Sequence, residues 1–224
     1  MIHNKKEIGD VDQRVVWDAI SKSWKKSREL PVPVVADFLK NKKGKVIDFG
    51  CGAGRNLIKN DKITYTAIDF SIGQLRYAKE KTKKEDIKAN FIKSDLTKTK
   101  LANNEFDYGL FMATLHCLET EQTRIASLKE FYRILKKNAE ALISVWNTNN
   151  PRFKDFDKDI YAEWEIDDKK YLRFYHLYDK DELIKLLESV GFKVLEIYEQ
   201  EYKYPGKKFY DRFVRRNIIV RIKK

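Results

Sequence analysis

A glycine-rich turn directly after an apolar run constrains this chain more than any other feature. The stretch KVIDFGCGAGRN, Lys45–Asn56, begins with a strand-like segment, Lys45–Phe49. The D-x-G-x-G-x-G pattern within it consists of Asp48, Gly50, Gly52 and Gly54. Glycine adopts backbone conformations closed to other residues and has no Cβ to keep a ligand away. The stretch therefore predicts a strand that ends in a loop against which a ligand packs.

The spacing of the glycines argues against a nicotinamide or flavin dinucleotide. A dinucleotide-binding turn needs its third glycine three positions after the second. In this chain that position is Arg55, and the glycine stands one residue earlier. We expect a short helix from Asn56 to follow the turn.

Apolar and amphipathic segments alternate along the chain, without internal repeats. Strands are expected at Lys45–Phe49, Tyr65–Phe70, Ala89–Lys93, Phe106–Met112 and Ala141–Trp146. Helices are expected at Val11–Lys26, Val34–Asn41, Ile72–Lys83, Glu121–Lys136 and Lys180–Val190. This alternation predicts a parallel sheet flanked by helices. Two later apolar runs, Val194–Tyr198 and Phe213–Ile222, predict an antiparallel pair at the end of the sheet.

Local signals mark where two of these helices end. The LPVP stretch, Leu30–Pro33, separates the first helix from the second because proline lacks the amide that a helix interior needs. Asn138 follows the RILKK end of the fourth long helix. We expect a left-handed residue there, a conformation in which Asn is the best substitute for Gly.

Two carboxylates follow the next expected strands. Asp69 stands 21 positions after Asp48, at the tip of the second strand, where a carboxylate accepts hydrogen bonds from a ribose diol. Asp95, in the KSDL stretch after the third strand, is placed to accept a bond from an exocyclic adenine amine. The backbone of Leu96 is placed to meet the ring. Together these positions indicate an adenosine site.

In this order, the features resemble the class I S-adenosylmethionine-dependent methyltransferases. The resemblance covers residues 30–222 and implies an α/β, Rossmann-like fold with helices on both faces of a seven-stranded, mostly parallel sheet. The implied strand order is 3-2-1-4-5-7-6, with the last strand antiparallel. The implied cofactor is S-adenosyl-L-methionine, held by Asp48, Gly50, Gly52, Gly54, Asp69, Phe70, Asp95, Leu96 and Met112.

Later blocks resemble a narrower group, the tRNA methyltransferases that esterify 5-carboxymethyluridine at the wobble position of the anticodon, including the methyltransferase half of the AlkB-homologue fusion. The blocks are Trp17–Leu39, Phe106–Asn147 and Arg173–Val194. The chain departs from that group at Cys117, where a second His is usual, and at Asn138-Ala139, where the group has Gly-Gly.

The chemistry of this resemblance requires no catalytic base, because a carboxylate is already anionic at neutral pH. What remains is orientation and partial desolvation of the reacting groups. Cations, hydrogen-bond donors and aromatic rings are therefore expected at the acceptor. The resemblance implies Arg28, His116, Trp146, Arg173 and His176 in these roles, with Tyr175 as support. Ordinary packing remains an alternative role for His116 and Trp146.

The net charge of +12 has two interpretations, a solvated Lys-rich surface or a polyanionic partner such as nucleic acid. Basic residues cluster in Ser21–Arg28 and in Lys203–Lys224. Within the second cluster, Arg212, Arg215 and Arg216 are placed to contact phosphates or to line a solvated strand edge. The resemblance selects tRNA as the polyanion.

The length predicts a single methyltransferase domain over residues 1–224, with an N-terminal helical entry segment at 1–30 and a substrate-side insertion at 148–178. No signal peptide or membrane-spanning run is apparent, so we expect a cytoplasmic location. Cys51 and Cys117 lack zinc-type spacing and are expected at strand ends, without a disulfide. Cys51 beside the glycines is a candidate nucleophile or a small residue in a tight turn.

The narrower resemblance also implies a partner, a small zinc-binding activator protein that adds its chain to the exposed edge of the sheet. The strand in KANFIKSDL, Lys88–Leu96, is the expected edge. Metal would then belong to the partner and not to this chain. Two alternative functions remain open: methylation of a small carboxylic acid or quinone precursor, and a non-catalytic RNA-binding subunit.

Overall fold

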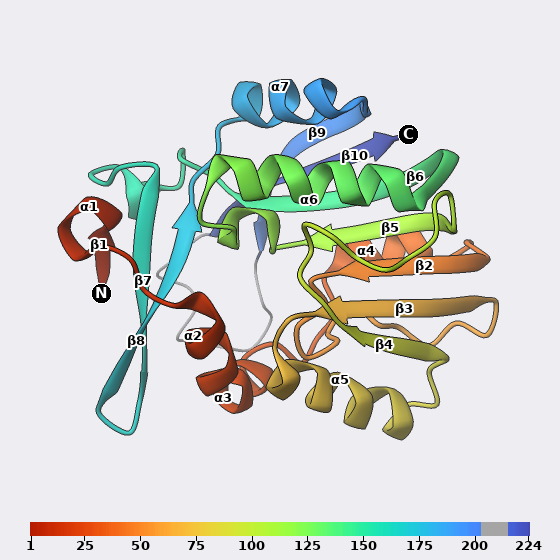
Figure 1. Cartoon of the computed structure of the whole chain (residues 1–224), viewed down its shortest axis with the longest axis horizontal. Coiled ribbons are helices and arrows are strands. Elements are labelled where there is room, and N and C mark those ends of the chain that lie inside the picture. The colour runs from red at the N-terminus through yellow and green to blue at the C-terminus, as the bar shows by residue number, and fades with distance from the viewer. Residues whose placement is uncertain (203–214) are drawn as a thin grey trace.

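A seven-stranded sheet forms the centre of the molecule (Figure 1). The computed structural model describes residues 1–202 and 215–224. In the order in which they lie side by side, the strands are β4 (Ala89–Lys93), β3 (Ile63–Asp69), β2 (Gly44–Phe49), β5 (Phe106–Met112), β6 (Leu135–Trp146), β10 (Arg215–Lys223) and β9 (Lys193–Tyr202). Strands β4 to β6 pair in parallel, and β10 runs antiparallel to both β6 and β9. This confirms the order 3-2-1-4-5-7-6 with the last strand antiparallel.

Helices cover both faces of this sheet. They are α4 (Pro33–Leu39), α5 (Ile72–Lys84), α6 (Glu121–Ile134) and α7 (Lys180–Val190). Successive residues of a strand point to opposite faces, so Val46 packs in the core cluster that includes α4 and α5, whereas Ile47 packs in the cluster that includes α6 and α7. The sheet is therefore buried on both sides, as the apolar strands predicted.

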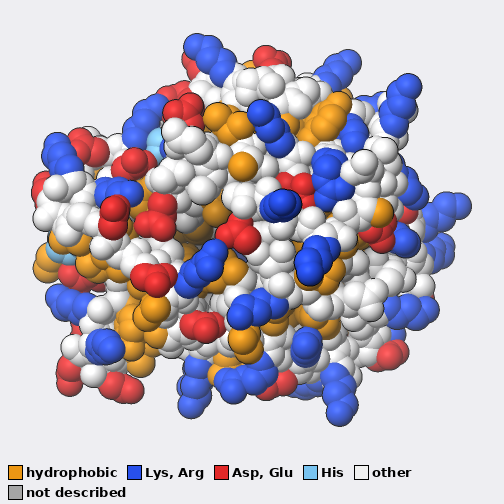
Figure 2. Space-filling view, in the orientation of Figure 1, with side chains coloured by type: hydrophobic (Ala, Val, Ile, Leu, Met, Phe, Trp, Pro, Cys, Tyr) orange, Lys and Arg blue, Asp and Glu red, His pale blue; other side chains and the backbone are white. Residues whose placement is uncertain are grey.

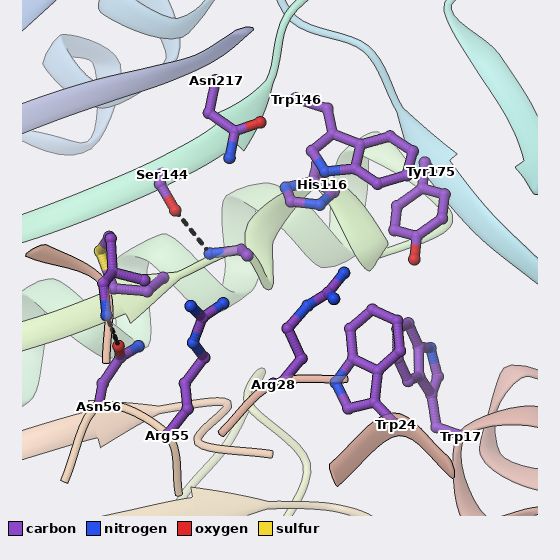
Figure 3. A pocket seen from close by; sticks show the side chains of 13 residues that line it. Trp17, Trp24, Arg28, Arg55, Asn56, His116, Ser144, Trp146, Tyr175 and Asn217 are labelled. Carbon is purple, nitrogen blue, oxygen red and sulfur yellow. Dashed lines mark hydrogen bonds between the residues drawn. The ribbon is translucent and has the colours of Figure 1, made fainter. Parts of the chain in front are cut away.

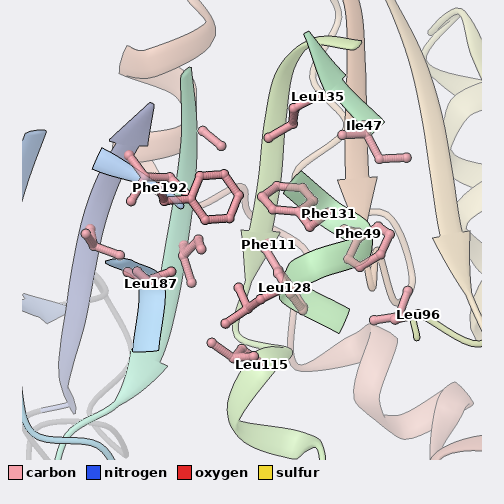
Figure 4. Close-up of a cluster of buried hydrophobic side chains, with 14 of the residues drawn as sticks. Ile47, Phe49, Leu96, Phe111, Leu115, Leu128, Phe131, Leu135, Leu187 and Phe192 are labelled. Carbon is pink, nitrogen blue, oxygen red and sulfur yellow. The ribbon is translucent and has the colours of Figure 1, made fainter. Parts of the chain in front are cut away.

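Three phenylalanine rings hold α6 against the sheet (Figure 4). Phe49 of β2, Phe111 of β5 and Phe131 of α6 have ring centroids 5.1 to 5.4 Å apart. Gly109 of β5 makes room for them, because a Cβ there would lie 2.5 Å from the Phe131 ring. This packing holds α6 against β2 and β5. The cavity described below opens at the carboxyl end of β5.

The N-terminal region and the insertion form a second, smaller sheet. It contains β1 (Ile2–Asn4), β7 (Asp159–Ile166) and β8 (Lys169–His176), all antiparallel. Neither strand of the β7–β8 hairpin was predicted from the sequence. Asp167 and Asp168 make its tight turn, with φ of 47° and 61°. This two-residue left-handed connection is one that Asp tolerates.

Three short helices and two 3₁₀ turns complete the fold. The helices are α1 (Lys5–Ile8), α2 (Gln13–Ala19) and α3 (Ser21–Lys26), and the turns are η1 (Leu115–Cys117) and η2 (Pro151–Phe153). The predicted single helix Val11–Lys26 is thus two helices that meet at Ile20. The predicted break at Leu30–Pro33 is confirmed. In the described residues, no helix has the length and apolarity needed to cross a bilayer.

The expected helix from Asn56 is wrong. Residues 52–56 form a turn, and residues 57–60 belong to no helix or strand. The ammonium group of Lys81 on α5 donates hydrogen bonds to the carbonyl oxygens of Gly54, Arg55 and Leu57, at 3.0, 3.4 and 2.6 Å. The carbonyl of Gly54 also accepts from the amide of Leu57 at 3.1 Å, so the chain closes a turn there, and Lys81 binds that turn.

Asn138 has the predicted left-handed conformation, with φ of 65°. Its setting differs from the prediction, because α6 already ends at Ile134 and Asn138 lies inside β6. Its amide donates to the carbonyl of Lys224 at 2.9 Å, so the residue joins β6 to the chain end. The predicted start of the last strand, Phe213, lies outside the described residues.

Candidate active site

A cavity of about 350 Å³ opens at the carboxyl ends of β2 to β5, under α2 and α3. Seven of the nine residues expected at the cofactor line it: Gly50, Gly52, Asp69, Phe70, Asp95, Leu96 and Met112. Parallel strands deliver these residues to one edge of the sheet, where open α/β sheets bind their ligands. The structure therefore brings the predicted positions together.

The first two glycines of the turn have different reasons to be glycine. At Gly50, with φ of 85°, a Cβ would lie 2.2 Å from the Thr114 side chain. At Gly52, with φ of 53°, the nearest atom to a Cβ would be Oε1 of Gln74 at 3.8 Å. Gly50 thus packs the turn against the protein, whereas Gly52 leaves open space on the cavity side.

Asp69 joins the glycine turn to the start of α5. One carboxylate oxygen accepts from the amide of Gly52 at 2.8 Å, and the other accepts from the amide of Ser71 at 2.9 Å. Burial raises the pKa of Asp69 to about 6, against the opposing effect of these amides. Each carboxylate oxygen has a second lone pair, so the group can still receive hydroxyl donors from the cavity.

Asp48 and Gly54 were expected at the cofactor, but neither lines the cavity. Asp48 is 1% exposed, and among the described residues its Oδ2 has no hydrogen-bond partner. Burial and the nearby charge of Asp69 raise the pKa of Asp48 to about 7, opposed by Lys81. Gly54 packs on α5, where a Cβ would lie 3.0 Å from that of Ala78. Asp48 is buried at the end of β2, and Gly54 lies within the turn on the side that packs against α5.

Asp95 lines the cavity and is tied to the helix above it. Its Oδ1 accepts from the amide and hydroxyl of Thr97 at 2.9 and 2.7 Å, and its Oδ2 accepts from Arg14 of α2 at 3.0 Å. Burial acts to raise the pKa of Asp95, but these bonds lower it overall. Arg14 and Asp95 therefore link α2 to the end of β4 across the cavity.

A second pocket, of about 70 Å³, adjoins the first at the end of β5 (Figure 3). The two share seven lining residues: Trp17, Trp24, Arg28, Arg55, Asn56, Met112 and Ala113. Three of the residues expected at the acceptor, Arg28, His116 and Trp146, line this smaller pocket. We call it the acceptor pocket, since it continues from the predicted cofactor cavity.

Stacked rings form one wall of the acceptor pocket. Trp146 and Tyr175 have centroids 3.8 Å apart with planes inclined by 23°, and His116 lies 5.5 Å from Trp146. Trp17 meets Tyr175 edge-on at 6.4 Å from the opposite side. Flat apolar walls of this kind suit a planar ring.

His116 is neutral at physiological pH. The side chain is 1% exposed, and burial lowers its pKa to about 3, although a hydrogen bond with the Ser144 backbone opposes the shift. The expectation that cations surround the acceptor therefore does not extend to His116. Its contribution to the pocket is a flat ring and not a charge.

The cations of the acceptor pocket are two arginines. Arg28 stacks its guanidinium 4.4 Å from the ring of Trp24, and Arg55 bonds the carbonyl of Leu30 through two nitrogens. In Figure 3 both guanidinium groups point into the space below His116. Among the described residues, no Asp or Glu lines this pocket. The pocket therefore favours an anion.

Arg173 and His176 lie outside the pocket. Arg173, 5% exposed, donates to the hydroxyl of Tyr175 at 2.7 Å and packs against the ring of Trp164 at 4.8 Å. His176 bonds Asp159 through Nδ1 at 2.6 Å and Glu182 through Nε2 at 2.7 Å. His176 directly follows Tyr175 on β8, so its side chain points to the opposite face. Arg173 shares the face of Tyr175 but packs against Trp24 and Trp164. Tyr175, expected as support, lines the pocket instead.

Several lining residues were not predicted: Trp17, Trp24, Arg55 and Asn217. The two tryptophans stand seven positions apart, a helical period that signals a shared face. Arg55 directly follows the last glycine of the turn, but the sequence analysis used it only to exclude a dinucleotide. Asn217 lies opposite Trp146 in the β10–β6 pairing, which no sequence signal indicated.

The remaining candidates are placed as follows. Arg212 lies outside the described residues, and for Arg215 and Arg216 the structure describes backbone only. Both cysteines are free thiols, and burial raises their pKa values well above the ordinary range. In the described part of the chain, no group of three His, Cys, Asp or Glu residues is arranged to hold a metal.

The cavity fits S-adenosylmethionine on its own geometry. Gly52 leaves the approach to the turn open, the Oε1 atom of Gln74 beside it is buried without a partner among the described residues, and Asp69 offers lone pairs to hydroxyl groups. Gly52 and Asp69 would hold the nucleoside, and Met112 would meet it at the junction with the acceptor pocket.

Comparisons with known proteins agree with this site. A family model described as a methyltransferase domain matches residues 46–138. The tRNA (carboxymethyluridine(34)-5-O)-methyltransferase of Schizosaccharomyces pombe is 27% identical over 208 residues, covering 81% of this chain and 88% of that protein. The alkbh8 protein of the same description from Xenopus tropicalis is 32% identical over 133 residues, covering 58% of this chain and 20% of that protein.

Solved structures share the fold at low identity. A SAM-dependent methyltransferase from Methanosarcina mazei superposes with a TM-score of 0.69 and 16% identity, covering 87% of this chain and 98% of that one. A SAM-dependent methyltransferase from Aquifex aeolicus gives a TM-score of 0.64 and 21% identity, with coverage of 92% and 97%. In its strand order and glycine turn, the chain has the Rossmann-like fold of these methyltransferases, and its residues 46–138 match the methyltransferase domain model.

Proposed function

We propose that the protein methylates the carboxylate of 5-carboxymethyluridine at the wobble position of tRNA. The observation that carries the proposal is the composition of the acceptor pocket. Arg28 and Arg55 line it, and the His116 ring in its wall is neutral. Two guanidinium groups beside a neutral histidine suit an acceptor that is already an anion.

On the cofactor side, S-adenosylmethionine supplies an electrophilic methyl group when bound. The turn at Gly52 and the carboxylate of Asp69 bind and orient the nucleoside. The Arg14–Asp95 pair, with its N···O distance of 3.0 Å, links α2 to the end of β4 at the rim of the cavity. These groups act by position, and none of them transfers a proton.

On the acceptor side, Arg28 and Arg55 hold the carboxylate through charge-assisted hydrogen bonds. The rings of Trp146 and Tyr175 give the pocket an apolar aromatic wall against which the base can pack. Burial among rings and guanidinium groups removes part of the carboxylate's hydration. The nucleophilic oxygen is then oriented toward the Met112 junction without any deprotonation.

The alternative functions fit the pocket less well. A hydroxyl acceptor such as a quinone precursor needs a base to remove its proton, and neither His116 nor a carboxylate supplies one in the described pocket. A small carboxylic acid would suit the arginines, but the relatives that span most of this chain are described as tRNA enzymes. A non-catalytic role leaves the open turn at Gly52 without a purpose.

The test is methyl transfer from labelled cofactor to defined acceptors, followed by mass spectrometry of nucleosides. The acceptors are tRNA carrying 5-carboxymethyluridine, the same tRNA with unmodified uridine, and a panel of small carboxylic acids. We expect a methyl ester on the modified wobble uridine only. Transfer to the small acids and none to RNA would overturn the proposal.

We further propose a protein partner at the edge of the sheet. Strand β4 ends the strand order and pairs only with β3 among the described strands, and Phe91 and Ile92 on it are partly buried. An unpaired edge of this kind accepts a strand from another chain. The family resemblance suggests a small zinc-binding activator. A chain that is monomeric, stable and fully active by itself would contradict this.

A further inference from the structure

The basic cluster at residues 21–29 does not stand alone in the folded protein. Helix α3 lies beside α5, as Figure 1 shows. Residues 21–29 and 72–85 together contain nine Lys or Arg and three Glu. This pair of segments therefore carries a net charge of +6, half that of the whole chain. Figure 2 shows Lys and Arg side chains gathered along the lower edge of the molecule, where the two helices lie.

A glycine allows the two helices to approach closely. At Gly73 of α5, a Cβ would lie 2.5 Å from the hydroxyl oxygen of Ser21. The amide of Gly73 also donates to the carboxylate of Asp18 at 3.1 Å. The first turn of α5 is thus held directly against α2 and α3. The lysines of both helices therefore form one surface with a defined spacing.

Tyr77 joins the two sets of cations. Lys25 of α3 lies 4.7 Å above its ring, and Arg76 of α5 lies at the same distance from it. Lys25 also pairs with Glu80 at 3.3 Å, which accounts for one of the three acids. The outer lysines of the pair remain exposed: Lys22, Lys26, Lys79 and Lys83.

This surface continues to the acceptor pocket. Trp24 belongs to α3 and lines both cavities, and Arg28 follows two residues after the helix ends. From Lys79 to Lys83 the axial rise along α5 is about 6 Å, which is close to the distance between neighbouring phosphates of an extended nucleic-acid strand. A strand whose base entered the acceptor pocket would carry its backbone across these lysines.

We propose that the exposed face formed by α3 and α5 is the docking surface for the phosphate backbone of the RNA next to the modified base. The proposal rests on the tRNA function proposed above, and it adds where the rest of the RNA binds. The face recognises charge and spacing and not sequence, because its outer residues are lysines, whose ammonium groups bind phosphate as point charges and do not reach base edges.

The test is binding of unmodified tRNA as a function of salt, measured by fluorescence anisotropy. The variant has Lys22, Lys26, Lys79 and Lys83 each changed to Gln. A matched control changes four exposed lysines elsewhere, Lys129, Lys137, Lys185 and Lys193, so that both proteins lose the same charge. We expect at least about a tenfold weaker Kd for the face variant, and a salt slope lower by about 2–4, since each lost phosphate contact removes roughly 0.7–0.9.

Equal losses in both variants, or none in the face variant, would overturn the proposal. Binding of phosphatidylserine vesicles that is stronger than tRNA binding and depends on the same four lysines would also overturn it, in favour of a membrane surface. Methyl transfer by the face variant to free 5-carboxymethyluridine should match that of the unaltered protein. If the unaltered protein binds tRNA through this face yet never methylates it, the proposed function fails while the docking surface stands.

Discussion

Arg55 donates two hydrogen bonds to the carbonyl oxygen of Leu30, through Nε at 3.0 Å and Nη2 at 2.8 Å. The next residue, Asn56, accepts a hydrogen bond from the amide of Val32 at 3.3 Å. The end of the glycine turn thus holds the loop that carries Arg28. These hydrogen bonds join the segment at the cofactor site to the segment at the acceptor site. The spacing between the two sites is therefore fixed by direct contacts.

Replacement of Arg55 tests this connection. The change Arg55→Gln removes the fork that bonds Leu30 and one of the two positive charges of the acceptor pocket. We expect methyl transfer to fall at least about tenfold, with cofactor affinity within about twofold of the original. Transfer assays and calorimetric titration measure the two quantities. Arg221→Gln, far along β10, serves as control and should change neither; equal losses in both quantities for Arg55→Gln would place Arg55 in the cofactor site.

Replacement of Asp69 should lower cofactor affinity, the quantity that Arg55→Gln leaves nearly unchanged. The change Asp69→Ala removes the carboxylate expected to bind the ribose hydroxyls, and we expect cofactor binding to weaken by about 1–3 kcal/mol. Calorimetric titration measures this, with a thermal melt to detect any loss from the Gly52 and Ser71 bonds. The exposed Asp61→Ala is the control. Unchanged affinity would move the ribose site elsewhere.

Replacement of Gly50 should mainly lower stability, whereas replacement of Gly52 should mainly lower cofactor affinity. In Gly50→Ala the new methyl meets Thr114 at 2.2 Å, so we expect a loss of about 2–4 kcal/mol in the free energy of unfolding. In Gly52→Ala the methyl enters open space, so unfolding should change by only about 1 kcal/mol while cofactor affinity falls. Denaturant titration and calorimetry give both values. A Gly52→Ala protein that binds cofactor normally contradicts the assignment of the turn.

The pH dependence of methyl transfer should show no contribution from the titration of His116. Burial holds the pKa of His116 at about 3, and the acceptor carboxylate needs no base. Asp69 and Asp48, with pKa values of about 6 and 7, titrate in the neutral range whether or not a base acts. We therefore expect any step in the single-turnover rate between about pH 5.5 and 8.5 to be the same in His116→Gln as in the unaltered protein. Rates of both proteins across this range check the expectation. A step that is present in the unaltered protein and absent from His116→Gln would mean that His116 acts as a base.

Stability should depend on pH through His176. Burial acts to lower the pKa of His176, but hydrogen bonds with Asp159 and Glu182 raise it overall. A raised pKa means that the folded state binds the proton more tightly, so this stabilisation is present below about pH 6.5 and is lost as pH rises through the folded value. The pKa values of Asp159 and Glu182 are lowered, so their share is lost in acid, below about pH 4.

The variant His176→Asn measures the cluster. We expect its melting temperature to fall below that of the unaltered protein by about 2–4 °C at pH 5.5, with a smaller difference at pH 8.5. Thermal melts at both pH values, with His3→Asn as a control for a histidine on β1, make the comparison. A difference that grows with pH would reverse the sign and exclude the ion-pair account.

Much of the fold follows from local sequence. The apolar runs Ala89–Lys93 and Phe106–Met112 and the helix Lys180–Val190 have the predicted bounds, because strand and helix periods are properties of neighbouring residues. The hairpin of β7 and β8 was not predicted, because its strands mix charged and aromatic residues and are stabilised by pairing with each other and, for β7, with the distant β1. Similarly, the helix expected after the turn does not form. Lys81 binds the carbonyl oxygens there, a contact that no local sequence pattern reveals.

The sequence by itself determined the alternation of strands and helices and seven of the nine positions expected at the cofactor cavity, because a glycine turn and carboxylates at strand tips need only their own segments to take effect. The strand order came from the family resemblance. Tertiary structure alone decided which side chains form the acceptor pocket. Arg28, Arg55, Trp146 and Tyr175 come from four separate segments and meet only when the sheet and helices pack. The physical reason is that a charge or ring becomes part of a site through its distance to others, and that distance is set by long-range packing.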